Sequence, residues 1–88
     1  MTNTPKTIRS ECLRPGDSFE RPSPEEIRAV LELAGLSGAG ASDYLGLGRG
    51  GGRTVRRWTG GDSHIPYAAW ALLCHAAGLG EIWKHTPY

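Results

Sequence analysis

The clearest hydrophobic pattern of the chain lies between Ser23 and Gly35, where apolar side chains recur at helical spacing. Ser23 and Glu26 form a Ser-x-x-Glu capping box, and Pro24 occupies the first helical position, where proline is well tolerated. Gly35 follows the last apolar position and is suited to ending the helix. The pattern therefore predicts a helix with one buried stripe. The residues of that stripe are Ile27, Val30, Leu31 and Ala34.

Two shorter helical patterns follow. The first covers about residues 37–46, where small side chains permit the close approach of another helix and Tyr44 and Leu45 are expected to pack on the core. The second covers about residues 52–59 and places Val55 and Trp58 on its inward face. The arginines of this segment then fall on the opposite, outward face. They are Arg53, Arg56 and Arg57.

A fourth pattern, from Pro66 to Ala77, is apolar all round, with His75 as its one clearly polar residue. Such a helix is buried on more than one side. One small core leaves little to cover the second side, so we expect self-association through this helix and a short fifth turn at residues 80–84, rather than a helix enclosed within a monomer. The expected dimer contacts are Tyr67, Trp70, Ala71, Leu72, Cys74, His75, Leu79, Ile82 and Trp83.

Residues 1–22 carry three prolines and no helical period, so we expect a mostly irregular N-terminal arm with a turn near residues 14–17. Residues 23–88 are expected to form one domain with a C-terminal dimerisation region. The predicted fold class is therefore all-α, a compact bundle of about five helices. No run approaches the roughly 20 apolar residues of a membrane span, and no apolar run suits a signal peptide. We expect a cytoplasmic protein without a membrane partner, with Cys12 and Cys74 as free thiols.

Charge is unevenly distributed, although the net charge is only +1. Residues 11–43 carry −4 and residues 44–61 carry +4, and residues 49–61 hold four arginines and no acid. A local basic patch matters more for nucleic-acid binding than the total charge does. A plain solvated surface is the alternative interpretation, and it is less favoured because the arginines follow a glycine turn on one face of a predicted helix.

A basic helix presented by a small scaffold fits the major groove of double-stranded DNA, so the sequence indicates sequence-specific DNA binding. Arginine offers a planar fork to guanine edges and phosphates, threonine suits a phosphate or a thymine methyl group, and glycine amides can approach a phosphate. The candidate DNA-binding residues are Arg49, Gly51, Gly52, Arg53, Thr54, Arg56, Arg57, Thr59, Ser63 and His64. The arm also carries basic residues, namely Lys6, Arg9, Arg14 and Arg21. These could order on DNA or pack against a partner subunit, and the acidic residues of the arm argue against ordering on DNA.

The glycine-rich connection contains a literal G-x-G-x-x-G at residues 46–51. A dinucleotide site needs a preceding strand and a βαβ unit, for which this chain has no room. A phosphate-binding P-loop needs Gly-Lys followed by Ser or Thr, and the lysines of this chain are Lys6 and Lys84. No cofactor is therefore expected.

Side chains that bind metals or act as nucleophiles are present but not clustered. The candidates are Cys12, His64, Cys74, His75 and His85. They form no C-x-x-C or H-x-x-x-H pair, and Cys74 and His75 diverge because they are neighbours on a helix. We expect a buried thiol and a surface histidine, hence no metal site and no enzymatic activity. Trp58, Trp70 and Trp83 lie beside apolar residues, which favours core and interface roles over base stacking.

Two stretches resemble the helix-turn-helix of Xre and lambda-repressor-like regulators, within a match that covers about residues 24–78. They are Leu36-Ser37-x-Ala39-x-x-Ser42-x-Tyr44-Leu45-Gly46-Leu47 and Arg53-Thr54-Val55-x-Arg57-Trp58-x-x-Gly61-x-x-x-Ile65-Pro66. Within that superfamily, the run at residues 53–62 and the apolar fourth helix resemble small plasmid-encoded repressors of the KorC type.

The resemblance implies a bacterial transcriptional repressor, associated with the nucleoid or a plasmid, that binds a palindromic operator as a homodimer. Its third helix would read the major groove and its second would lie across it. The connection at residues 48–52 is about three residues longer than such motifs usually have. The start of the recognition helix and the role of Arg49 are therefore left open.

A second class of function is also open, namely an antitoxin-type interaction module that binds a partner protein through its termini and autoregulates its operon. The long polar arm favours this alternative. Other plasmid or phage regulators are further candidate partners. RNA binding is disfavoured because nothing resembles a stacking sheet or a K-homology loop.

Overall fold

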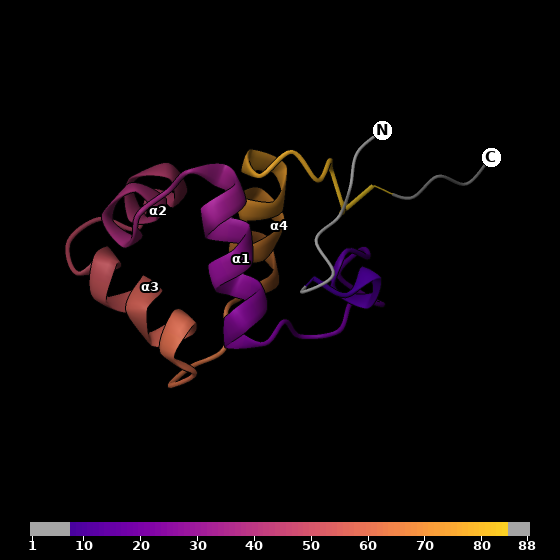
Figure 1. Ribbon diagram of the computed structural model, residues 1–88, viewed down its shortest axis with the longest axis horizontal. Helices are drawn as coiled ribbons and strands as arrows, with labels where there is room; N and C mark the ends of the chain where they lie inside the picture. Colours follow the sequence, from indigo (N-terminus) through magenta and orange to yellow (C-terminus); the bar gives the residue numbers. More distant parts are fainter. Residues whose placement is uncertain (1–7, 85–88) are drawn as a thin grey trace.

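Four α-helices follow one another in the computed structural model, which describes residues 8–84 (Figure 1). They are α1 (Pro24–Ala34), α2 (Gly38–Leu45), α3 (Gly51–Gly60) and α4 (Tyr67–Ala76), preceded by the single-turn 3-10 helix η1 (Ser10–Cys12). No strand occurs within residues 8–84, so the expected all-α fold is confirmed. The segment near residues 80–84 is a turn, as expected, so residues 8–84 contain four α-helices rather than about five. Gly78 and Gly80, at φ +83° and +91°, turn the chain away from helical geometry there.

The ends of α1 are as the sequence predicts. The backbone N–H of Glu26 donates to the Ser23 hydroxyl, and the backbone N–H of Ser23 donates to the Glu26 carboxylate, completing the capping box. Gly35 closes the helix in the left-handed conformation, at φ +70°. These local signals fix both boundaries of α1 before any tertiary contact is considered.

α1 lies at the centre of the bundle and contacts both α3 and α4, while α2 packs on α3 and on α4 (Figure 1). The inward face of α3 is the predicted one, because Val55 and Trp58 are both buried. The largest fully buried side chains come from α1, α3, α4 and the segment before α1. They are Trp70, Leu73, Val30, Val55, Cys12 and Cys74.

The described part of the expected N-terminal arm, residues 8–22, packs on the bundle and contributes to its core. Cys12 is fully buried, and the indole N–H of Trp70 donates to the Cys12 carbonyl at 2.7 Å. The hydroxyl of Tyr67 donates to the Arg14 carbonyl at 3.0 Å. The turn of this segment lies at residues 15–18, one position later than predicted. Residues 1–7, which include Lys6, and residues 85–88, which include His85, lie outside the described residues.

An ion pair between the exposed Arg9 and the buried Glu26 attaches this segment to the start of α1. The Glu26 side chain is 3% exposed and accepts hydrogen bonds from the backbone N–H and the Nε of Arg9, at 2.8 and 2.9 Å. Burial acts to raise the pKa of Glu26, but the hydrogen bonds from Arg9 and from the Ser23 N–H outweigh it and hold the pKa at about 2. The carboxylate is therefore charged at neutral pH and joins two segments 17 positions apart.

Candidate nucleic-acid interface

The outward face of α3 is basic along its length. Arg53, Arg56 and Arg57 are exposed, opposite the buried Val55 and Trp58, as the helical period predicts. α3 contains no acidic residue. Ion pairs within residues 8–84 involve only Arg9, Arg28 and Lys84 among the basic residues, so the α3 arginines are not neutralised there.

The two threonines of α3 use their hydroxyl protons within the helix. Thr54 Oγ1 donates to the Gly50 carbonyl at 3.4 Å, and Thr59 Oγ1 donates to the Arg56 carbonyl at 3.1 Å. Thr54 is exposed and Thr59 is half-buried. Thr54 therefore presents a methyl group to solvent more readily than it presents a donor to a phosphate.

The connection between α2 and α3 places the start of α3 at Gly51, one residue before the predicted start. Gly46, Gly48 and Gly50 all adopt positive φ, between +69° and +81°. Gly50 caps α3 without a side-chain hydrogen bond, which leaves first-turn N–H groups for another acceptor. Arg49, before that turn, is exposed, and so are Ser63 and His64 after α3.

Gly51 and Gly52 differ in their surroundings, although both are candidate DNA contacts. Gly51 is buried against α2, where a Cβ atom would lie 2.0 Å from Ser42 Oγ and 2.7 Å from Leu47 Cβ. A Cβ on Gly52 would meet only Arg56 Nη1, at 3.7 Å. Gly51 therefore serves the packing of α3 on α2, and Gly52 is the more accessible of the two.

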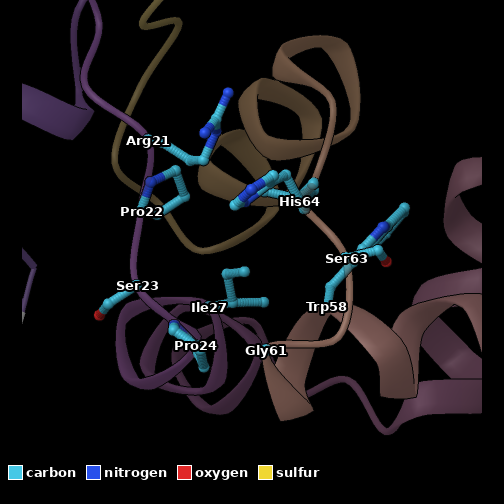
Figure 2. A pocket seen from close by; sticks show the side chains of 10 residues that line it. Arg21, Pro22, Ser23, Pro24, Ile27, Trp58, Gly61, Ser63 and His64 are labelled. Carbon is cyan, nitrogen blue, oxygen red and sulfur yellow. The ribbon is translucent and has the colours of Figure 1, made fainter.

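A cleft of about 240 Å³ lies beyond the C-terminal end of α3 (Figure 2). Ile27, Trp58 and Ile65 are its apolar lining, and polar groups come from Arg21 on one side and from Ser63 and His64 on the other. Arg21 was not among the ten candidate contacts. The sequence signal for it is slight, a single arginine directly before Pro-Ser-Pro at the start of α1.

The outer face of α4 is less exposed than its apolar sequence suggests. Trp70, Ala71 and Cys74, expected at a dimer contact, are buried in the protomer's own core. The reason is the segment at residues 8–22, which covers the second side of α4 that the sequence analysis took to be uncovered. Ile82 is also buried, while Tyr67 and Leu79 are half-buried and His75 is exposed.

One apolar hollow of about 380 Å³ is present on this face, lined by Tyr67, Ala68, Ala71, Leu72 and Trp83. Leu72 is 42% exposed and Trp83 is 38% exposed, and the Trp83 ring stands 6.0 Å from that of His75. Both described cysteines are free. Burial, followed by the charge of Glu26, raises the pKa of Cys12 to about 11, and burial raises that of Cys74 to about 12. Neither thiol is activated as a nucleophile.

None of the described helices is long and apolar enough to cross a membrane. No family model matches the chain, and no solved structure matches it. Two curated proteins, each a "Transcriptional repressor protein KorC" of Escherichia coli, are similar to it. One is 61% identical over 86 residues, which covers 98% of this chain and 100% of the relative. The other is 62% identical over 77 residues, covering 88% and 91%. With this identity along nearly the whole of both chains, the protein belongs to the KorC family of transcriptional repressors.

Proposed function

We propose that the protein is a transcriptional repressor that binds a palindromic operator in double-stranded DNA as a homodimer, in the bacterial cytoplasm. In this proposal α2 and α3 act as a helix-turn-helix of the Xre and lambda-repressor type. The observation that carries it is the exposed face of α3, where Arg53, Arg56 and Arg57 lie without an acidic partner within residues 8–84. The printed names of the KorC relatives, which are transcriptional repressors, support it.

The division of roles follows from the exposure of each residue. α3 would enter the major groove, where Arg53 and Arg56 suit guanine edges and Arg57 suits a phosphate. Arg49 lies before α3 and Ser63 and His64 after it, so they would contact the DNA backbone on the two sides of the groove. The first-turn amides near Gly52 would bind a phosphate at the helix N-terminus.

A second copy of the chain is the proposed occupant of the apolar hollow on α4. α4 packs on α1 and α2, and α3 presents a separate exposed face, so a contact through Leu72 and Trp83 would leave α3 free for DNA. A two-fold dimer requires half-sites about 10 bp apart for both recognition helices to meet one face of the duplex. Doubling the contact also supplies affinity that one short helix lacks.

The test is fluorescence anisotropy with DNA located by footprinting upstream of the protein's own gene cluster. Arg53→Ala and Arg56→Ala should each lose about 1–3 kcal/mol of operator binding and relax preference at one position per half-site. Arg14→Ala, an exposed arginine away from α3, is the control and should bind as wild type does. If alanine at all three α3 arginines leaves binding unchanged, α3 is not the recognition helix. Copurification with a second protein, without DNA affinity, would favour the antitoxin-type module instead.

A further inference from the structure

The segment before α1 brings one more arginine to the proposed DNA face. We propose that Arg21 contacts the DNA backbone beside α3, and that the Arg9–Glu26 ion pair positions it there. This inference rests on the proposed DNA-binding function and adds to it a contact from outside the two-helix motif. It also gives a role to the Arg9–Glu26 ion pair, which the recognition helix alone does not explain.

The position of Arg21 follows from the contact between the start of α1 and the end of α3. Pro24 lies so close to Gly61 that a Cβ there would be 3.3 Å from Pro24 Cγ. Arg28, one turn into α1, donates from its guanidinium to the Thr59 carbonyl. Figure 2 shows the result, in which Arg21 and His64 stand on opposite sides of one cleft, with Ser63 beside His64. Arg21 therefore lies next to the loop already expected to contact the DNA backbone.

The acids of this region do not neutralise Arg21. Arg9 pairs with Glu20 at 3.3 Å and with Glu26 at 2.9 Å. Glu25, on the first turn of α1, lies 3.7 Å from Arg28. Asp62 does not line the cleft, and its carboxylate is turned toward Gly60. Of the three acids at residues 1–22, Glu20 is paired with Arg9, whereas Glu11 and Asp17 form no ion pair within residues 8–84 and do not line the cleft. Arg21 itself forms no ion pair within residues 8–84.

The backbone of Arg21 is held in place before any DNA is bound. Arg9 Nη2 donates to the Arg21 carbonyl at 2.9 Å, while its Nε donates to Glu26. One guanidinium fork therefore ties the residue to the start of α1. Pro22 follows directly and restricts the local backbone. Because less conformational entropy is lost when such a residue binds, a fixed arginine contributes more to affinity than one on a free arm.

Phosphate is the ligand that this arrangement favours. A guanidinium, a hydroxyl and an imidazole can all donate to a phosphate oxygen, and the cleft lies beyond the end of α3 rather than along its groove-facing side. A contact to a phosphate of the DNA backbone contributes electrostatic attraction but no preference for a base. Arg21 should therefore add affinity for all DNA sequences alike.

The experiment compares Arg21→Ala with Arg14→Ala, another exposed arginine of the same segment, in anisotropy titrations between 50 and 200 mM salt. The slope of the logarithm of the association constant against the logarithm of the salt concentration becomes shallower by about 0.9 for each lost phosphate contact. A dimer that loses two contacts, one from each protomer, should therefore bind DNA about sixty-fold more weakly at 0.1 M salt. The loss should be equal on operator and on unrelated DNA, and Arg14→Ala should keep the wild-type slope. An Arg21→Ala slope and affinity equal to wild type would overturn the proposal.

Arg56→Ala, measured in the same titrations, separates this inference from the proposed function. If Arg56→Ala weakens operator binding and Arg21→Ala does not, only the additional contact is wrong. If Arg21→Ala leaves binding unchanged and so does alanine at each of the three α3 arginines, the proposed DNA face is wrong as a whole. Loss on operator but not on unrelated DNA would instead assign Arg21 to base recognition and overturn its assignment to the backbone.

The positioning role of Arg9 is tested by Arg9→Lys, which keeps the charge but cannot bridge Glu26 and the Arg21 carbonyl with one fork. Circular dichroism should show a folded protein, and its DNA affinity should approach that of Arg21→Ala. In the Arg21→Ala background, Arg9→Lys should cause little further loss of affinity. Additive losses would show that Arg9 acts independently of Arg21.

Discussion

Alanine substitution at two neighbouring glycines should change stability in opposite directions. A Cβ atom at Gly51 would lie 2.0 Å from Ser42 Oγ, 3.0 Å from Ser42 Cβ and 2.7 Å from Leu47 Cβ. The hydroxyl can rotate away, but the two Cβ atoms are fixed to the backbone, so α3 must move away from α2. Such overpacking costs about 1–3 kcal/mol, which exceeds the alanine advantage of up to about 1 kcal/mol in a helix. Gly51→Ala should therefore be destabilised.

Gly52→Ala is the matched control, because it makes the same chemical change one position later. Its Cβ would meet only the end of the Arg56 side chain, at the ordinary contact distance of 3.7 Å. The backbone of Gly52 is not in the left-handed region, so alanine fits without strain. With only the propensity gain remaining, we expect this variant to be about 0.5–1 kcal/mol more stable than wild type.

The assay is urea and thermal unfolding followed by circular dichroism. For a domain of this size 1 kcal/mol corresponds to about 4–8 °C in Tm, so the overpacking cost of about 1–3 kcal/mol should separate the Tm values of the two variants by roughly 4–24 °C. Adding Ser42→Gly to the Gly51→Ala protein should recover part of the lost stability. The recovery should be incomplete because the close contact with Leu47 Cβ remains. A Gly51→Ala protein as stable as Gly52→Ala would refute the close packing of α3 on α2 at this position.

Three further predictions concern the core and the α4 surface. Because the pKa of folded Glu26 is about 2, below its ordinary 4.5, its stabilisation is complete above about pH 5 and is lost as the pH falls toward 2. Glu26→Gln should cost roughly 1–3 kcal/mol at pH 7 in urea unfolding and flatten the pH dependence in that window. Cys12 and Cys74 should react with a thiol reagent only as fast as the protein unfolds; rapid labelling of the native protein would contradict their burial. Leu72→Asp should give monomers with weak operator binding in light scattering and anisotropy. Leu33 is similarly exposed, at 45%, but lies away from the hollow, so Leu33→Asp should leave both the oligomeric state and the operator affinity unchanged.

The local signals in the sequence were sufficient for most of the helices. Ser23, Glu26 and Gly35 set the ends of α1 through hydrogen bonds within a few residues, and the spacing of Val55 and Trp58 sets the buried face of α3. The outward direction of the α3 arginines follows from that spacing. These features depend on neighbouring residues, so they could be predicted without knowledge of the fold.

Contacts between distant segments could not be predicted in this way. The segment at residues 8–22 has no hydrophobic period, yet its Cys12 is fully buried, its carbonyl accepts from the Trp70 indole, and the segment covers the side of α4 expected to face a partner. The Arg9–Glu26 pair likewise joins positions 17 apart. Gly51 looked equivalent to Gly52 because only the approach of α2 distinguishes them. In each case the determining neighbour lies on another element.

The most direct test of the central claim, that α3 reads a two-fold operator, is guanine N7 methylation protection on DNA upstream of the gene cluster. Wild-type protein should protect guanines in the major groove of two inverted half-sites about 10 bp apart. Arg53→Ala and Arg56→Ala should each lose protection at one guanine per half-site and leave the rest of the pattern in place. An asymmetric pattern, or one that neither variant changes, would contradict the account.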